Sequence, residues 1–229
     1  MSKSLIFLTI ASLLFINCKD SNKNQDISLI FPVGMVWVEG KSYTKGAKTE
    51  DPYAMMREKP SHEVYVDGFF IDETEVTNNQ FQKFIEETGY VTVAERQIDW
   101  NEMKKNLPVN TPKPHDSLLQ PGSLIFNKDI ESVVNMDNYF QWWKWQIGAS
   151  WKSPTGPGSN IEGKGNYPVV HVAYEDALAY CKWSNRKLPT EAQWESAAQG
   201  NYDKAVFTWG SEVNLLNTNA NTWQGDFPT

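Results

Sequence analysis

The chain has 229 residues, of which 40% are apolar and ten are tryptophans, and its formal net charge is −7. This length suits one domain with an appendage, and this composition can build a core, which excludes a globally disordered chain. The acidic balance argues against a nucleic-acid partner, because proteins that bind nucleic acids display basic stripes to the phosphates. No apolar run reaches the length of a membrane-spanning helix.

Residues 1–18 have the pattern of an export signal. A lysine gives a positive start, Leu5–Ile16 is an apolar run of suitable length, and Cys18 closes the run. A cysteine at this place, ahead of a polar tether at 19–29, resembles a bacterial lipobox, although Asn17 departs from the usual small residue. We therefore predict an exported lipoprotein, anchored to a membrane by acyl groups on Cys18 and facing the periplasm or the cell surface. The alternative is an ordinary signal peptide with an incidental cysteine.

The mature domain is expected to span residues 30–229, and it opens with strand patterns. Met35–Val38 is a run of strand formers. Residues 61–67 alternate in polarity, with Val64 and Val66 on one face. Both segments are predicted strands.

A helix follows from Thr77, which forms a capping box with the glutamine three residues later. Phe81 and Phe84 belong to its inner stripe, and Gly89 ends it. Three acidic residues precede the helix, where its positive end favours them. A paired-carboxylate catalytic site is the other interpretation of this acidic group. The three residues are Asp72, Glu73 and Glu75.

Residues 96–139 have poor periodicity and several proline breaks, which predict a surface loop with little regular structure. Tryptophans then cluster within ten positions. They are Trp142, Trp143, Trp145 and Trp151.

The stretch 168–200 predicts a short buried strand at Pro168–Val172, a helix, a tight connection and a second helix. His171 in the strand is expected to be a hydrogen-bonded core histidine. The second helix begins at Thr190 with a capping box and ends at Gly200. Apolar spacing predicts the inward face of each helix. These faces are Tyr174, Ala177, Leu178 and Cys181 in the first helix, and Trp194, Ala197 and Ala198 in the second.

These motifs, in this order, resemble the formylglycine-generating enzymes, also called sulfatase-modifying factors. The most recognisable run is Leu188–Glu195, LPTEAQWE, which follows Glu175–Ala177 at the family's spacing. Gly34–Trp37 and Glu75–Asn78 match the family's entry to the domain. The resemblance implies an α+β, C-type-lectin-like fold with low regular secondary structure, of which this chain holds the N-terminal portion.

The resemblance also implies site residues. In the family, a tryptophan pair, a Gly-Ala-x-Trp run and a Pro-x-Gly-Pro loop line the substrate groove, which implies that Trp142 and Trp151 border it here. The alternative is that both indoles belong to the core, because indoles dominate packing wherever they occur. The family also holds a structural calcium ion through an asparagine and the next residue, which implies Asn221 and Thr222. Calcium takes six to eight oxygens, so this calcium site is expected to be partial.

Formylglycine-generating enzymes oxidise the cysteine of a Cys-x-Pro-x-Arg sulfatase motif, using oxygen and a copper(I) ion held by two thiolates, which soft copper(I) prefers. The chain has two cysteines. Cys18 is assigned to the lipid anchor and Cys181 to structural packing as a small hydrophobe. In vertebrate-type members, a cysteine at this position pairs with one near the C-terminus. The family's thiolate pair lies in a segment beyond Thr229, so we expect a truncated domain without catalytic residues or copper ligands.

The resulting prediction is the N-terminal portion of an exported, sulfatase-modifying lipoprotein whose partner is a sulfatase polypeptide. The alternative, from another class, is a non-catalytic binding or motility-type surface lipoprotein on the same scaffold, because a fold does not certify an activity. Other chemistries lack support, since the sequence contains no His-Glu-x-x-His, Cys-x-x-Cys or Gly-x-Ser-x-Gly grouping.

Overall fold

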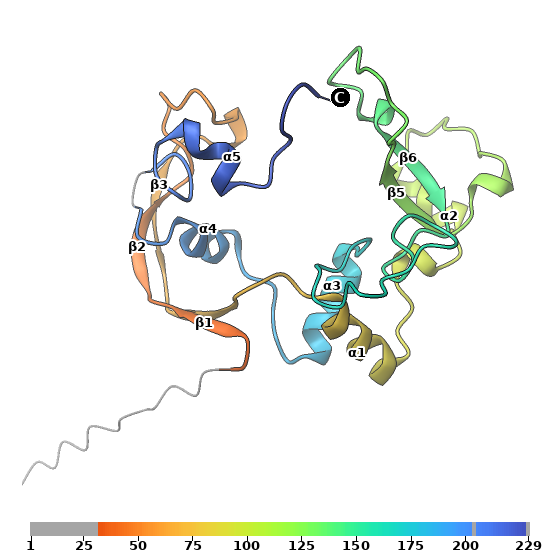
Figure 1. Cartoon of the computed structure of the whole chain (residues 1–229), viewed down its shortest axis with the longest axis horizontal. Coiled ribbons are helices and arrows are strands. Elements are labelled where there is room, and N and C mark those ends of the chain that lie inside the picture. The colour runs from red at the N-terminus through yellow and green to blue at the C-terminus, as the bar shows by residue number, and fades with distance from the viewer. Residues whose placement is uncertain (1–31, 203–204, 228–229) are drawn as a thin grey trace, which may run out of the picture. The chain divides into compact units, whose positions relative to one another are not determined.

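The computed structural model describes residues 32–202 and 205–227, and Figure 1 shows their helices and strands. The expected signal peptide, the lipidated Cys18 and the polar tether lie outside the described residues. Regular elements are short, and much of the described chain runs as turns and loops. No helix in these two ranges is both long and apolar enough to cross a lipid bilayer.

The strands of the described residues form three two-stranded antiparallel sheets. Each sheet has unpaired edges, so the sheets depend on helices and loops for cover. The pairs are β1 (Met35–Val38) with β4 (Phe69–Asp72), β2 (Lys41–Lys45) with β3 (His62–Val66), and β5 (Gly122–Phe126) with β6 (Trp143–Ile147).

Two strands of the first half follow their predicted patterns, while β2 and β4 were not predicted as strands. β1 and β3 confirm the predicted strands at 35–38 and 61–67. In β3, Val66 is 8% exposed and Tyr65 is 68% exposed, because successive side chains of a strand point to opposite faces. Residues 96–139 have little regular structure, as predicted, but β5 at Gly122–Phe126 was not predicted. Its partner β6 lies beyond a long excursion, and pairing over such a distance leaves little local signal.

α1 (Asn78–Thr88) begins and ends where its local signals predicted. The Gln80 amide donates to Thr77 Oγ1 at 3.3 Å, and the Thr77 amide donates to Gln80 Oε1 at 2.8 Å. These two bonds complete the capping box and satisfy donors that the start of a helix leaves unpaired. Gly89 follows with a φ of 67°, in the left-handed region that glycine adopts at little cost.

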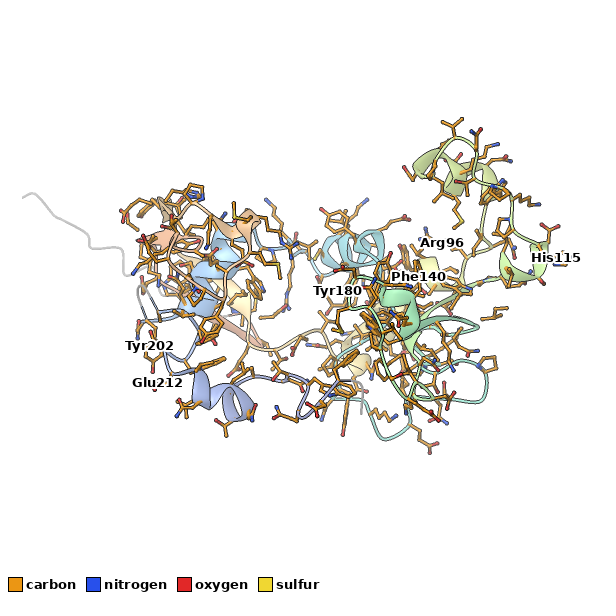
Figure 2. All side chains as sticks on the ribbon, turned by 90° about the horizontal axis from the view of Figure 1, so that it is seen from above. Arg96, His115, Phe140, Tyr180, Tyr202 and Glu212 are labelled. Atoms are coloured by element: carbon orange, nitrogen blue, oxygen red, sulfur yellow. The ribbon has the colours of Figure 1, made fainter. Side chains whose placement is uncertain are left out.

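The core of the described residues is a cluster of aromatic side chains between α1 and α3 (Tyr174–Trp183), with Tyr180 labelled in Figure 2. The centroids of the Phe81 and Trp151 rings lie 5.6 Å apart, and those of Phe84 and Tyr180 lie 5.7 Å apart, both edge to face. Such pairs contribute about 0.5–1.5 kcal/mol beyond their buried area. These four aromatic residues join the two helices.

α3 forms as predicted but turns a different face inward. Tyr174 and Leu178, which were assigned to the inner face, are 73% and 44% exposed, so that assignment is wrong. Asp176 and Tyr180 are buried instead, while Cys181 is half-buried. Apolar spacing favoured the wrong face because an aspartate is almost always an outward residue.

The inward turn of α3 depends on the Asp176 carboxylate, which is fully buried. It accepts hydrogen bonds from the Tyr90 hydroxyl at 3.0 Å, the Val93 amide at 3.0 Å and the Ala173 amide at 2.8 Å. These three donors offset the desolvation of the buried carboxylate. Burial and the hydrogen bond to Asp176 raise the pKa of the Tyr90 hydroxyl above its usual value.

α4 (Glu191–Gln199) confirms the predicted capping box at Thr190, and Gly200 ends it with a positive φ of 54°. Its predicted inner face is wrong at Trp194, which is 63% exposed. Ser196 is the buried residue of this helix. A bulky indole is therefore left on the outer side, and a small hydroxyl lies inside.

Polar contacts hold α4 against the β2–β3 sheet. The Tyr43 hydroxyl donates to the Ala192 carbonyl at 2.8 Å, and the Gly46 amide donates to the Glu195 carboxylate at 2.8 Å. The Gln199 side chain also donates to the Thr44 carbonyl at 3.3 Å. Residues 195 and 199 therefore belong to the face of α4 that contacts β2, which the apolar spacing did not predict.

The predicted strand at Pro168–Val172 is wrong. Within the described ranges, Pro168 alone in this run makes a β-bridge, with Thr77. His171 has a φ of 57°, a left-handed conformation that interrupts an extended run. Its imidazole is hydrogen-bonded as predicted, since Nε2 lies 2.8 Å from the Pro154 carbonyl oxygen.

The remaining regular elements are single turns, and none contains a buried residue. They shape the long connections and do not build the core. α2 covers Trp100–Met103, α5 covers Leu216–Asn219, and 3-10 turns cover Met56–Glu58, Val93–Glu95, Lys104–Asn106, Asp116–Leu118, Tyr139–Gln141 and Val213–Leu215.

Phe84→Ala should lower the free energy of unfolding by about 3–5 kcal/mol, because it removes a ring that is only 2% exposed and leaves a cavity between α1 and α3. Urea unfolding followed by circular dichroism measures the change. Phe140→Ala, at a ring that is 68% exposed, is the control and should shift stability by about 0.5 kcal/mol or less. Equal stabilities of the two variants would contradict the assigned core.

Tyr43→Phe should flatten the loss of stability at high pH. Burial and the negative charges of Glu195 and Glu191 raise the pKa of Tyr43 from 10.0 to about 12. The unfolded chain therefore releases this proton first, so the stabilisation is complete below pH 10.0 and is lost as pH rises through about 12. Urea titrations across this range should show a steeper fall in the wild type than in the variant. Tyr65→Phe, at an exposed tyrosine, should keep the wild-type slope.

Candidate functional site

Aromatic side chains gather where the β5–β6 hairpin meets residues 223–227. The ring of Phe126 on β5 has its centroid 5.8 Å from that of Trp223 and 6.3 Å from that of Phe227. Trp142, just before β6, has its ring centroid 5.4 Å from that of Phe227. These contacts tie the hairpin to a segment far along the chain.

β6 presents two further tryptophans, Trp143 and Trp145, which are 38% and 45% exposed. They lie on one face of the strand, because side chains two residues apart point the same way. The register places Phe126 opposite Trp143 and Leu124 opposite Trp145. Neither tryptophan was predicted as a site residue. The alternation of tryptophan with lysine in this run indicates a strand with both indoles on one face.

Two hollows lie along this hairpin, and His171 lines both of them. The larger has a volume of about 610 Å³ and includes Trp143 and Pro154. The smaller has a volume of about 280 Å³ and includes Trp145 and Val93. We call the two hollows together the hairpin groove.

The rim of the hairpin groove carries few charges. Lys128, Asp129 and Lys144 are its charged residues among those described. The Lys144 ammonium lies 3.6 Å from the Asp129 carboxylate in an exposed pair, which contributes little to stability. The groove is therefore mainly an aromatic and aliphatic surface.

The wall of the groove at Val93 is held by the buried Asp176 carboxylate, which accepts from the Val93 amide. Arg96, labelled in Figure 2, extends this network. Its Nη2 donates to the Tyr90 hydroxyl at 2.7 Å, and its Nη1 pairs with the Glu175 carboxylate. The wall is thus fixed by contacts between segments far apart in the sequence. Apolar spacing along the chain does not predict such contacts.

Glu95 makes a second set of stabilising contacts, in the 3-10 turn Val93–Glu95. Its carboxylate accepts from the Thr92 hydroxyl at 2.8 Å and lies 2.7 Å from the Lys152 ammonium. Burial by itself would raise the pKa of Glu95, but the Lys152 ammonium and the Thr92 hydrogen bonds lower it below the usual value. The ionised carboxylate therefore helps to fix the turn next to Val93.

The structure places the two predicted groove tryptophans in different clusters. Trp142 is half-buried in the aromatic cluster of the hairpin. Trp151 is 5% exposed and packs on Phe81 in the core, which is the alternative that the sequence left open. Neither lines the hairpin groove as defined. Their substrate-binding role stays a prediction.

Asn221 and Thr222, the predicted calcium ligands, are exposed and directly precede Trp223. The Thr222 carbonyl oxygen accepts a hydrogen bond from Gln224 Nε2 at 3.2 Å. Across residues 32–202 and 205–227, no three His, Cys, Asp or Glu side chains gather closely enough to hold a metal ion. Two neutral oxygens do not make a calcium site, so the described residues fit this ion only as part of a larger set.

Cys181 is the cysteine among the described residues, and it is a free, half-buried thiol. Burial raises the pKa of this thiol, the Asp72 carboxylate raises it further, and the Arg186 guanidinium lowers it. The thiol is therefore protonated at neutral pH. Copper(I) selects deprotonated thiolates in pairs, so this part of the chain does not fit the ion, and we derive no reaction step through it. The packing role of Cys181 stays a prediction.

Comparisons with known proteins identify the family. The model of the sulfatase-modifying factor enzyme 1-like domain matches residues 31–229. The formylglycine-generating enzyme of Mycobacterium tuberculosis is 40% identical over 198 residues, which are 85% of this chain and 60% of that protein. The mouse enzyme of the same name is 36% identical over 197 residues, covering 85% of this chain and 47% of that protein.

A bovine relative, the inactive C-alpha-formylglycine-generating enzyme 2, is 36% identical over 196 residues, covering 86% of this chain and 58% of that protein. The chain therefore spans about half to three-fifths of the length of these relatives. Low regular secondary structure, the ordered motifs and the match to the family model all agree. The chain belongs to the sulfatase-modifying factor enzyme 1-like family, as its motifs predicted.

Proposed function

We propose that this chain is part of a formylglycine-generating enzyme and that its hairpin groove binds the cysteine-containing peptide of a sulfatase. Membership of the family supports the reaction class. The whole activity is oxidation of the substrate cysteine to formylglycine, for which bound copper(I) and oxygen would supply the redox chemistry. The described residues contribute recognition of the peptide, because their thiol content does not fit the metal.

The observation that carries this proposal is the pair of exposed indoles along the hairpin groove. A Cys-x-Pro-x-Arg peptide offers a proline ring and a guanidinium group, and both pack on aromatic faces. Trp143 and Trp145 supply two such faces on one side of β6. The wall at Val93 is fixed by the buried Asp176 carboxylate, so little ordering is needed when a peptide binds.

The second candidate function is a non-catalytic binding module on the same scaffold. The relative named as an inactive C-alpha-formylglycine-generating enzyme 2 matches this chain at an identity and coverage close to those of the enzymes. The hairpin groove would then serve recognition alone. Mass-spectrometric detection of the aldehyde in a Cys-x-Pro-x-Arg peptide, after incubation of the full-length gene product with copper and oxygen, supports the enzyme; bound but unconverted peptide supports the module.

Calcium binding by Asn221 and Thr222 belongs to the same proposal, with the missing ligands supplied by other parts of the full-length protein. Both residues precede Trp223, which contacts the ring of Phe126 on the hairpin. A bound ion at this place would stiffen the segment that covers the aromatic cluster.

We further propose that the protein is exported and anchored through acyl groups on Cys18, with the domain facing the periplasm or the cell surface. The apolar run ahead of Cys18 and the polar residues after it support this. Cys18→Ser should release the protein from membranes into the soluble fraction and remove the acyl mass from its N-terminal peptide. Fractionation and mass spectrometry measure both. A variant that stays on the membrane would point to an uncleaved signal segment.

Trp143→Ala should weaken binding of a fluorescein-labelled Cys-x-Pro-x-Arg peptide by about 5- to 30-fold, because loss of a stacking indole removes about 1–2 kcal/mol of binding free energy. Fluorescence polarisation measures the dissociation constant. Tyr65→Ala removes an aromatic ring from the exposed face of β3, far from the groove residues in sequence, and should bind like the wild type. Unchanged binding by Trp143→Ala would reject the groove as the peptide site.

A further inference from the structure

The two hollows of the hairpin groove differ in their chemistry. The smaller hollow, which includes Trp145, has no carboxylate, ammonium or guanidinium group in its lining among the described residues. The larger hollow, which includes Trp143, carries the charged residues of the groove, Lys128, Asp129 and Lys144. A ligand that contacts both hollows therefore meets one uncharged surface and one charged surface.

His171 separates the two hollows, because it lines both of them. Its Nε2 lies 2.8 Å from the Pro154 carbonyl oxygen, and this nitrogen carries the proton because a carbonyl can only accept. Its φ of 57° is a conformation that residues other than glycine rarely adopt. Backbone conformations of this kind are found most often at sites that bind ligands. The boundary between the hollows is therefore held in place by a hydrogen bond and by the local backbone.

The indoles of the two hollows are spaced like alternate side chains of an extended peptide. Trp143 and Trp145 are two residues apart on β6, so their Cα atoms lie about 6.5 Å apart and both side chains leave the same face. In a Cys-x-Pro-x-Arg peptide, the proline and the arginine are also two residues apart. In an extended peptide these two side chains share one face at the same spacing. One peptide can therefore contact both indoles at once.

The chemistry of the hollows decides which peptide side chain occupies each. A guanidinium in the smaller hollow would lose water without gaining a carboxylate, whereas a proline ring carries no charge to desolvate. In the larger hollow, the guanidinium can stack on the Trp143 indole and reach the Asp129 carboxylate.

The lysines of the larger hollow oppose a cation only weakly. The Lys144 ammonium lies 3.6 Å from the Asp129 carboxylate in an exposed pair, which a bidentate guanidinium can replace. Lys128 is exposed, so water and salt screen its charge. The larger hollow thus remains the better place for the arginine.

We propose that the sulfatase peptide binds the hairpin groove in one register and one direction, with its proline on Trp145 and its arginine on Trp143. This inference rests on the proposed function, which assigns a Cys-x-Pro-x-Arg peptide to the groove. The arginine follows the proline in the peptide, whereas Trp143 precedes Trp145 in β6, so the peptide runs antiparallel to β6. The peptide cysteine, two residues before the proline, then lies level with Ile147, where β6 ends.

The test crosses two indole variants with three fluorescein-labelled peptides, which are the parent Cys-x-Pro-x-Arg peptide, a form with leucine in place of arginine, and a form with alanine in place of proline. Fluorescence polarisation under reducing conditions gives each dissociation constant. The leucine form should bind the wild type and Trp145→Ala about 2- to 30-fold more weakly than the parent does, and Trp143→Ala should lose this preference. The alanine form should bind the wild type and Trp143→Ala about 2- to 10-fold more weakly, and Trp145→Ala should lose this preference.

Asp129→Asn tests the charged part of the register. It should reduce the preference for arginine over leucine by about two- to fivefold, because the contact is exposed, and it should leave the preference for proline unchanged.

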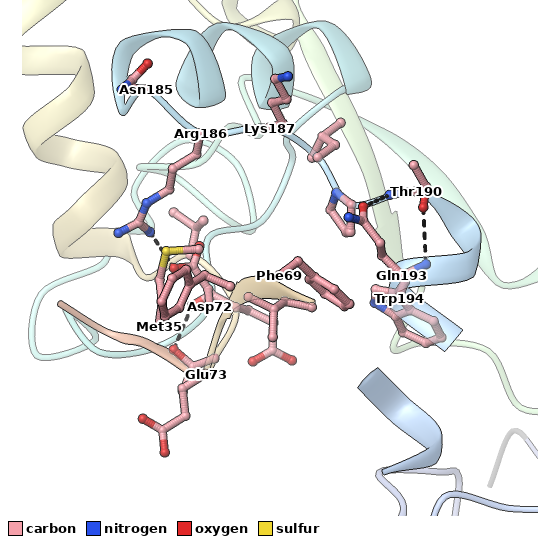
Figure 3. A pocket seen from close by; sticks show the side chains of 17 residues that line it. Met35, Phe69, Asp72, Glu73, Asn185, Arg186, Lys187, Thr190, Gln193 and Trp194 are labelled. Carbon is pink, nitrogen blue, oxygen red and sulfur yellow. Dashed lines mark hydrogen bonds and ion pairs between the residues drawn. The ribbon is translucent and has the colours of Figure 1, made fainter. Parts of the chain in front are cut away.

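The matched control is Trp194→Ala, which removes an indole that is 63% exposed. Figure 3 shows Trp194 beside a different hollow, of about 850 Å³, which is lined by β4 and residues 185–190. This variant should bind all three peptides like the wild type. Circular dichroism should show the wild-type fold in Trp143→Ala and Trp145→Ala, since both indoles are partly exposed.

Exchanged preferences would overturn the register and leave the peptide site in place. In that case Trp145→Ala would lose the preference for arginine, and Trp143→Ala would lose the preference for proline. Preferences that persist in both variants, or that disappear together in both, would also overturn the register. Absence of binding by the parent peptide would reject the proposed function, and the register with it.

Discussion

The arrangement of this domain depends on one buried carboxylate. Asp176 sets the face that α3 turns inward, because it joins the first turn of that helix to the Tyr90 hydroxyl and to the Val93 amide. Once this face is fixed, Tyr180 meets Phe84, and the aromatic core between α1 and α3 follows. The same carboxylate fixes one wall of the hairpin groove. A single charge therefore connects the core to the surface that we propose binds a peptide.

Short sheets leave most of the organisation to side chains. Each sheet of the described residues has two strands, which are marginal in isolation, so their cover decides whether they persist. α4 packs against the β2–β3 sheet through hydrogen bonds that the Tyr43 hydroxyl and the Gly46 amide donate. The aromatic residues of 223–227 pack against the β5–β6 hairpin through the ring of Phe126. In both places the partners are far apart in the chain, which makes folding of these parts dependent on long-range closure.

The sequence predicted those features that depend on residues close together in the chain. Capping boxes at Thr77 and Thr190 located the starts of α1 and α4, because both partners of each box lie within four residues. The predicted inner faces were wrong at Tyr174 and Leu178 of α3 and at Trp194 of α4. In α3 the buried residue is Asp176, whose partners Tyr90 and Val93 lie far away in the sequence. The β5–β6 hairpin was missed for the same reason.

The residues of the candidate site were also predicted only in part from the sequence. The family resemblance nominated Trp142 and Trp151, and the structure places the first in the hairpin cluster and the second in the core. Trp143 and Trp145, which line the hairpin groove, were not nominated, because their register is fixed only when β5 pairs with β6. His171 was predicted to be hydrogen-bonded and is, but its place at the junction of two hollows follows from the turn around it.

The excursion between β5 and β6 has an evolutionary consequence. The two strands are held in register by their own ladder and by the rings packed on Phe126, while the residues between them contain one 3-10 turn and no buried side chain. Insertions or deletions there need not disturb the tryptophans of β6. Such changes can reshape the edge of the hairpin groove at Lys128 and Asp129 while the scaffold beneath it is retained.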